Sequence, residues 1–185
     1  MPLSVTRPEV LENGSDEQFR KVIYDLFVTA TRFDEIREGF GRAIGVSGPQ
    51  YFILVAVGRG YSGTGPNAEP DGGIGVRALA DYLGVAPSHV TVEVGKLVRH
   101  GLLEKRPHPD DGRRVQISLT TAGQAALEEL APLRQDMNNI LFDGITAEEF
   151  RHLSNVMARF TETTARAQME MARREQERGF QSAAE

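Results

Sequence analysis

A short segment in the middle of the chain most constrains its fold. Residues 76–84 and 86–101 each predict a short helix with one apolar face. Gly84 lies between them and permits the positive φ that a tight turn needs. The small Ala80 allows the two helices to approach closely, and Val90 fills the space between them. This spacing of Ala80, Gly84 and Val90 predicts a helix-turn-helix.

A hairpin is expected directly after these helices. Residues 102–106 and 115–119 predict two strands, and the sequence HPDDGRR between them predicts a turn. A hairpin in this position is a wing, and its tip carries Arg113 and Arg114 beside Asp111. A thin basic tip suits the narrow minor groove of DNA, where arginine is favoured electrostatically. Asp111 is expected to orient Arg113 through a charge-assisted pair.

The N-terminal region predicts two helices. Apolar residues recur at three- and four-residue steps over residues 19–40, and Ser15 is the expected cap of that helix. The apolar run YFILVAV that follows suits a buried strand or a buried helix. Ser47 as cap, with Pro49 in the first turn and Gln50 at the third helical position, favours the helix. Residues 58–75 are rich in glycine and proline and predict a mobile loop, with a short strand possible near Ile74.

Helical patterns return after residue 120. Thr121 is expected to open one helix, which Pro132 should kink or split. Thr146 and Glu149 form a capping box for a last helix. The charged tail from about Arg173 is expected to fray.

The amino-acid composition excludes several kinds of functional site. The 185 residues include no cysteine, which excludes disulfide scaffolds, thiol nucleophiles and cysteine metal sites. The net charge is −5, but residues 76–120 carry seven basic against five acidic side chains, a net +2. Any contact with nucleic acid must therefore depend on this local patch. The chain has no signal-peptide pattern and no apolar run that spans a bilayer, so a cytoplasmic location is expected.

The central motifs resemble those of a known family. The match lies in LVRHGLL (residues 97–103), in Asp111-Gly112-Arg113, and in Leu119-Thr120 with Gly123 after them. Residues 76–123 thereby resemble the winged helix-turn-helix of the MarR family of bacterial transcription regulators. The resemblance implies an obligate homodimer that inserts two recognition helices into a pseudo-palindromic operator of double-stranded DNA. It also implies a small-molecule effector, often an aromatic or phenolic acid, bound between the dimerisation helices and the winged module.

The sequence departs from the family pattern at several places, including a loop at 61–75 that is longer than usual. Val92 stands where many relatives have a polar residue, so base readout there is expected to be apolar. Glu93 stands where relatives tend to be apolar, and either an outward orientation or a pair with a nearby basic residue would accommodate it. His108 replaces a frequent aspartate at the start of the wing turn.

These observations give one expected architecture and one expected interface. The fold class is mainly α (α+β), a winged helix-turn-helix with long N- and C-terminal helices that form a dimerisation domain. Its parts are N-terminal dimerisation helices over 1–60, a flexible loop over 61–75, the DNA-binding domain over 76–120, C-terminal dimerisation helices over 121–175 and a frayed tail over 176–185. The expected DNA-binding residues are Ser88, His89, Thr91, Val92, Lys96, Arg99, Arg113 and Arg114, with Asp111 orienting the wing.

Other function classes have weaker sequence support. Gly58-x-Gly60-x-x-Gly63 matches a dinucleotide fingerprint, but the residues after it cannot form the helix that the fingerprint needs. His100, His108, Asp110 and Asp111 lack the spacing of a metal site, so no metal or cofactor is expected. No catalytic constellation is present, and the expected function is that of a non-enzymatic repressor relieved by a small ligand. The alternative is a winged helix that binds protein and has no operator.

Overall fold

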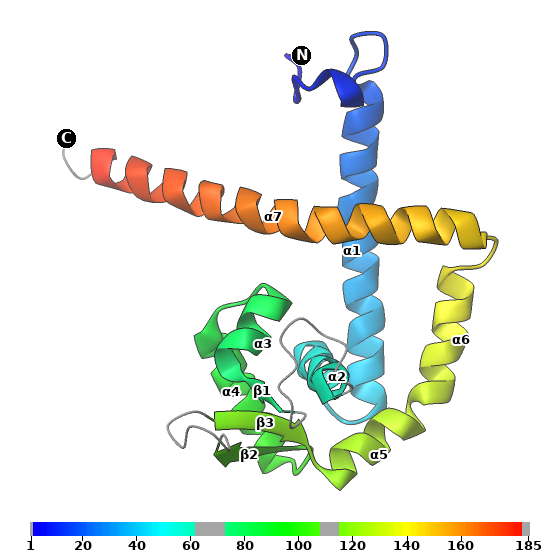
Figure 1. Ribbon diagram of the computed structural model, residues 1–185, viewed down its shortest axis with the longest axis vertical. Helices are drawn as coiled ribbons and strands as arrows, with labels where there is room; N and C mark the ends of the chain where they lie inside the picture. Colours follow the sequence, from blue (N-terminus) through cyan, green and yellow to red (C-terminus); the bar gives the residue numbers. More distant parts are fainter. Residues whose placement is uncertain (1, 62–72, 108–114, 183–185) are drawn as a thin grey trace. The chain divides into compact units, whose positions relative to one another are not determined.

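The computed structural model describes residues 2–61, 73–107 and 115–182 (Figure 1). The chain forms two compact units, Met1–Arg134 and Gln135–Glu185. The first unit contains a three-stranded antiparallel sheet in the order β1-β3-β2 among helices, and the described part of the second unit is helical. The mainly α (α+β) fold class is confirmed. The elements are a 3-10 turn (Pro8–Val10), α1 (Glu17–Ala43), α2 (Gly48–Tyr61), β1 (Ile74–Gly75), α3 (Val76–Leu83), α4 (Pro87–Arg99), β2 (Leu103–Pro107), β3 (Val115–Leu119), α5 (Thr121–Glu129), α6 (Ala131–Leu141) and α7 (Ala147–Ser182).

The cap position of the first helix is one residue later than expected. Ser15 accepts a hydrogen bond from the Glu17 amide at 3.2 Å, but the residue before the helix is Asp16. Its carboxylate is buried and does not cap α1. It accepts hydrogen bonds from the Ser4 amide at 2.6 Å and the Ser4 hydroxyl at 2.5 Å, and it pairs with Arg20 at 2.9 Å. The Ser4 hydrogen bonds lower the pKa of Asp16. This carboxylate therefore holds the N-terminal segment against the start of α1.

The apolar run after residue 50 is a helix, as the capping signal predicts. The Gln50 side-chain oxygen accepts a hydrogen bond from the Ser47 backbone amide at 3.1 Å, and the Gln50 backbone amide lies 3.4 Å from the Ser47 hydroxyl. This reciprocal pair satisfies two amides at the start of α2. The Glu38 carboxylate of α1 accepts a third hydrogen bond, from the Gly48 amide at 3.0 Å. The first turn of α2 is thereby fastened to α1.

Helices α3 and α4 form the helix-turn-helix that the sequence predicts. Gly84 adopts φ +66° between them. Ala80 and Val90 are fully buried where the two helices meet, as expected for their sizes. The core of the unit joins α2, α3, α4 and the three strands, and its fully or almost fully buried apolar side chains include Ile53, Leu54, Val57, Leu79, Val94, Leu97, Leu103 and Ile117.

The strands form the predicted hairpin with a small third strand. β3 spans residues 115–119 as predicted, and β2 begins one residue later than predicted, at Leu103. Leu103 faces Leu119 across this pair. The predicted short strand near Ile74 is β1, in which Ile74 faces Ile117 on the other side of β3. Figure 1 shows this sheet beside α3 and α4. Helix α2 extends to Tyr61, so the first residues of the expected 58–75 loop are helical.

Pro132 coincides with the predicted break. Helix α5 ends at Glu129 and α6 begins at Ala131, because a proline inside a helix removes one hydrogen bond and crowds the preceding turn. The cap of α5 is Thr120 rather than the predicted Thr121. The Thr120 hydroxyl accepts a hydrogen bond from the Gly123 amide at 3.0 Å and donates one to the Gly101 carbonyl at 2.6 Å.

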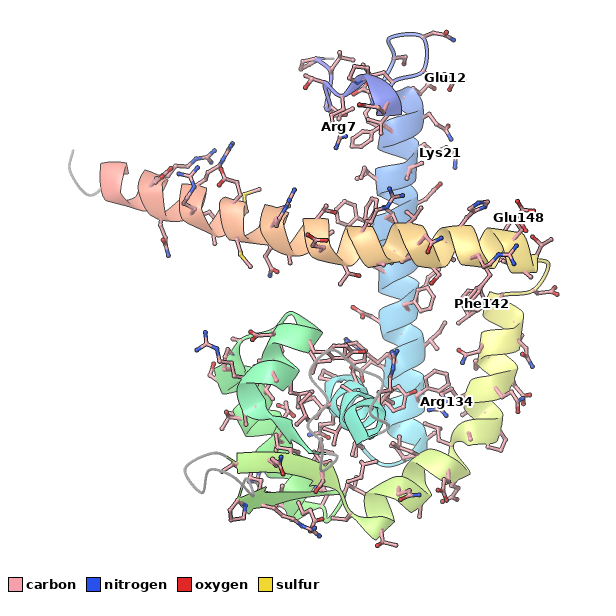
Figure 2. The ribbon with its side chains drawn as sticks, in the orientation of Figure 1. Arg7, Glu12, Lys21, Arg134, Phe142 and Glu148 are labelled. Carbon is pink, nitrogen blue, oxygen red and sulfur yellow. The ribbon has the colours of Figure 1, made fainter. Side chains whose placement is uncertain are left out.

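The second unit contains the predicted capping box at the start of α7. The Glu149 carboxylate accepts hydrogen bonds from the Thr146 amide at 2.8 Å and hydroxyl at 2.7 Å, and these bonds lower the pKa of Glu149. Phe142 and Phe150 pack edge to face across the same turn, with ring centroids 5.6 Å apart. Phe142 lies just after α6 and Glu148 in the first turn of α7 (Figure 2). These contacts fix the turn between α6 and α7.

Helix α7 continues to Ser182, into the segment 176–185 that was expected to fray. Glu170 pairs with Arg173 at 2.7 Å and with Arg174 at 2.6 Å, and Arg173 also pairs with Glu177. Charge pairs three and four residues apart stabilise an exposed helix, and their repetition supports this segment. The hydrogen bonds from Arg173 and Arg174 lower the pKa of Glu170 to about 2.

The end of α7 is therefore expected to lose helix in acid. The folded Glu170 carboxylate has a pKa below its ordinary value of 4.5, so its support is present above pH 4.5 and disappears as the pH falls toward 2. Carbon-13 Cα shifts of residues 168–178 would follow this loss. Glu170→Gln should lower the helicity at pH 7 and flatten its dependence between pH 5 and pH 2. Glu175→Gln removes the same charge on the same helix and is the matched control. Equal profiles for both variants would contradict the assignment.

No single helix within the described residues is long and apolar enough to cross a membrane. Helices Glu17–Ala43 and Gly48–Arg59 meet the length and composition criteria only as a pair, and they bend by 83° where they join. Ile53, Leu54, Ala56 and Val57 of the second helix lie in the protein core, which accounts for its apolar composition.

Candidate nucleic-acid interface

The recognition helix presents most of its predicted contact residues to solvent. Val90, Val94 and Leu97 are buried, and they attach α4 to the core along one stripe. The opposite side of the helix is exposed. Five of the six residues predicted on α4 are on this side: Ser88, His89, Thr91, Val92 and Arg99.

The chemistry of this surface is mixed. The Val92 side chain is 55% exposed and is therefore accessible to a partner. A valine methyl group suits contact with the methyl group of thymine in the major groove. The Thr91 hydroxyl donates to the Pro87 carbonyl at 2.9 Å. Ser88 is not the cap of the helix, since the residue before α4 is Ala86 and it supplies no side-chain hydrogen bond. The Ser88 side chain therefore remains on the outer surface.

The sixth residue, Lys96, is held by an ion pair. Its ammonium lies 2.7 Å from one carboxylate oxygen of Glu93. The other oxygen accepts a hydrogen bond from the Gln50 amide nitrogen at 2.9 Å. Glu93 is only 8% exposed, so of its two expected environments the pairing is confirmed and the outward orientation is wrong. The hydrogen bond from Lys96 is the main cause that lowers the pKa of Glu93.

Sequence reasoning missed Gln50 as a part of this site. The hydrogen bond between Gln50 and Glu93 joins α2 to α4 across 43 residues of sequence. Helical periodicity gives no information about contacts at such a separation. A signal was nevertheless present. Glu93 lies three residues after Val90 and four before Leu97, on the edge of the buried stripe, where a carboxylate needs a polar partner.

The predicted wing residues lie outside the described residues. Arg113, Arg114 and the orienting residue Asp111 belong to the segment 108–114, so their contribution stays a prediction. The described base of the wing carries Lys105 and Arg106 on its exposed strand. Arg106 pairs with Glu104 at 2.7 Å.

The sequence also contains a dinucleotide-like glycine pattern and several histidine and acidic residues. Gly58 and Gly60 of the dinucleotide pattern lie inside α2, whereas that fingerprint needs a strand before its first glycine. Within residues 2–61, 73–107 and 115–182, no three acidic or histidine side chains cluster in a way that could hold a metal ion.

A cavity of about 890 Å³ lies in the first unit, between α2, the polar face of the sheet and helices α5 and α6. Gln116 of β3 lines it and is 7% exposed, and its side-chain nitrogen has no hydrogen-bond partner. The charged residues that line the cavity are Arg59, Glu104, Arg106, Glu128 and Arg134, of which Arg134 is labelled in Figure 2.

A helix-turn-helix followed by a hairpin, with a recognition helix exposed on its outer side, defines the winged helix-turn-helix class. Comparison with known proteins then shows which family this class of fold resembles here. Residues 70–115 match the model of the MarR family. This match covers α3, α4 and the described base of the wing, and it confirms the predicted resemblance.

Individual similar proteins point to the same resemblance. An uncharacterised HTH-type transcriptional regulator of Bacillus subtilis (strain 168), YwhA, is 25% identical over 87 residues. The alignment covers 47% of this chain and 63% of that protein. The PcaV transcriptional regulator from Streptomyces coelicolor, solved in complex with its natural ligand, is 25% identical with a TM-score of 0.54, over 74% of this chain and 91% of that one.

A third comparison concerns the fold alone. A putative MarR family regulator from Listeria monocytogenes, solved in complex with a 26mer DNA, is 19% identical with a TM-score of 0.65. The superposition covers 78% of this chain and 89% of the Listeria protein. The chain is thus similar to MarR-family transcription regulators in sequence and in fold.

Proposed function

We propose that this protein is a sequence-specific DNA-binding transcription regulator that acts as a homodimeric repressor, and that a small ligand relieves its binding to the operator. The exposed outer side of α4 carries the proposal, because Ser88, His89, Thr91, Val92 and Arg99 are free of the core. In a winged helix this surface is the one that enters a major groove. The wing residues Arg113 and Arg114 are proposed to contact the minor groove and backbone of the same operator.

A homodimer is proposed from the apolar side chains of α1. Val22, Tyr24, Phe27 and Phe33 are between 45% and 71% exposed. In the second unit Ile140, Phe150, Met157 and Met169 are between 46% and 70% exposed. Large apolar side chains exposed in such numbers are unfavourable in water unless a partner covers them. A second copy of the chain is the proposed partner, which would place two recognition helices on successive major grooves of a pseudo-palindromic operator.

The cavity in the first unit is the proposed effector site. It touches α2, the sheet and α5, so a bound molecule would contact helices of the expected dimerisation regions and the winged module together. The unpartnered amide of Gln116 favours a ligand that carries a hydrogen-bond acceptor. A ligand releases DNA only if it binds better to the conformation that no longer fits the operator.

Fluorescence anisotropy tests the proposal. Labelled duplexes from the region upstream of the protein's own coding sequence are titrated across a salt series against a random duplex. Specific binding with two protein chains per duplex supports the sequence-reading dimer. Equal weak binding to both duplexes contradicts it and favours the alternative of a protein-binding winged helix. Small carboxylic and phenolic acids are then added to the complex, and operator affinity that no bound acid changes would contradict the ligand-relieved mechanism.

Arginine substitutions give a second, independent test. Arg99→Ala and Arg113→Ala should each weaken operator binding and reduce the magnitude of the salt slope by about one, since each arginine would neutralise about one phosphate. Arg159→Ala on α7 is an exposed control outside the proposed DNA-contacting surface and should leave the slope unchanged. If Arg113→Ala behaves as this control does, the wing assignment is wrong.

A further inference from the structure

The buried carboxylate of α4 has two partners of different kinds. One oxygen of Glu93 contacts the Lys96 ammonium at 2.7 Å, on the side of α4 that reaches solvent. The other contacts the Gln50 amide at 2.9 Å, on the side that packs against α2. Glu93 therefore bridges the scaffold of the unit and the exposed surface of the recognition helix.

The side-chain amide of Gln50 can adopt only one orientation in this arrangement. Its oxygen accepts from the Ser47 amide at 3.1 Å, and its nitrogen donates to Glu93. A flipped amide would place its nitrogen against an N–H donor and its oxygen against a carboxylate, so only one orientation satisfies both partners. The same turn of α2 is attached to α1 through the Glu38 carboxylate and the Gly48 amide at 3.0 Å. A continuous set of hydrogen bonds thus connects α1, α2 and α4.

The ion pair also changes the charge that α4 presents. Lys96 and Arg99 are the basic residues of its last turn. Because Glu93 neutralises Lys96, Arg99 supplies most of the net positive charge there. The affinity for random DNA depends on the number of phosphates that the protein neutralises. The affinity for a specific operator also depends on where the recognition helix lies in the groove.

We propose that Glu93 is a positioning residue that sets DNA specificity, because it fixes α4 to α2 through Gln50 and withholds the charge of Lys96 from the DNA backbone. This inference depends on the proposed DNA-binding function. It assigns Glu93 two separable effects, one on the placement of the recognition helix and one on the electrostatic attraction to any duplex.

Glu93→Gln tests the electrostatic effect. The variant retains the shape and a hydrogen-bond acceptor for Gln50, but it releases Lys96. Binding to a random duplex should strengthen at low salt, and its loss between 50 and 200 mM salt should grow by about threefold, as expected for one more phosphate contact. The operator-to-random affinity ratio should fall. Glu93→Gln with Lys96→Gln restores the charge balance and should return the salt slope to that of the wild type.

Gln50→Met tests the placement effect. It removes the tie to α2 while the Glu93–Lys96 pair stays, so the salt slope should be unchanged and the operator-to-random ratio should fall about fivefold or more, the size of one lost base contact. Ser47→Ala is the control for the capping box, since it weakens the start of α2 without touching Glu93. Glu129→Gln is the charge control, on an exposed position of α5. Circular dichroism melts establish that each variant is folded at the assay temperature.

The outcomes separate the two proposals. A wild-type protein without operator preference overturns the proposed function, and this inference with it. A wild-type protein with operator preference, together with a Glu93→Gln variant that keeps the salt slope and the affinity ratio of Glu129→Gln, overturns the inference alone. A double variant whose salt slope stays raised also overturns it. A fall in the ratio for Gln50→Met, absent in Ser47→Ala, supports the placement effect.

Discussion

Val90→Asp is expected to unfold the winged module. The Val90 side chain is fully buried between α3 and α4, and in that position a carboxylate would have no counter-charge within the core. An uncompensated buried charge costs about 3 to 5 kcal/mol, a large part of the total stability of a typical domain. Urea denaturation followed by circular dichroism should show a much lower midpoint or no cooperative transition.

Val92→Asp is the matched control for this substitution. It makes the same chemical change two residues away on the same helix, where the side chain is 55% exposed. Its stability should stay within about 0.5 kcal/mol of the wild type, as is usual for a surface position. Operator binding should nevertheless weaken, because a negative charge would face DNA. Equal loss of stability in both variants would mean that the burial of Val90 is wrongly assigned.

Gly123→Ala is expected to have the second large effect. A Cβ atom at this position would lie 2.1 Å from the Leu102 carbonyl oxygen. That carbonyl cannot easily retreat, since it accepts a hydrogen bond from the Thr120 amide at 3.2 Å. Movement of α5 instead would disturb the cap, in which the Thr120 hydroxyl bonds the Gly123 amide. Overpacking of this kind costs about 1 to 3 kcal/mol, which exceeds the gain of about 0.5 to 1 kcal/mol that alanine brings to a helix.

Gly95→Ala provides the comparison. Its added Cβ would meet only the end of the Arg99 side chain, at 3.8 Å, which is an ordinary contact. This variant should therefore be as stable as the wild type or more stable, by up to about 1 kcal/mol. Thermal unfolding of both variants would check the prediction. A Gly123→Ala protein that melts at or above the wild-type temperature would show that α5 and the Leu102 carbonyl do not approach as closely as described.

Local signals account for most of the fold that was predicted. Ala80, Gly84 and Val90 specify the helix-turn-helix because each acts within a few residues of the turn. Pro132 and the Thr146 capping box are equally local, and both appear where predicted. The cap of α5 was misplaced by one residue because Thr120 and Thr121 are both suitable caps, and Thr120 also hydrogen-bonds the Gly101 carbonyl, nineteen residues earlier in the sequence.

Long-range contacts account for what the sequence did not reveal. Asp16 has the position of a helix-capping acid, but its carboxylate accepts a hydrogen bond from Ser4, twelve residues earlier, instead of capping the helix. Gln50, the second partner of Glu93, lies on another helix, so the prediction named only a nearby basic residue, which is Lys96 of the same helix. Whether α7 continues past residue 175 depended on the sum of several weak charge pairs rather than on one strong signal. The candidate cavity likewise depends on how α2, the sheet and α5 assemble.

The contact between Gln50 and Glu93 has a consequence for how this sequence could evolve. At the third position of a capping box, glutamate and glutamine serve equally well, so mutation would be expected to exchange them freely. Glu93 removes that equivalence, because a glutamate at position 50 would set two carboxylates side by side. Among related proteins, we therefore expect glutamine at position 50 wherever position 93 is glutamate, and free exchange of glutamine and glutamate wherever position 93 is apolar.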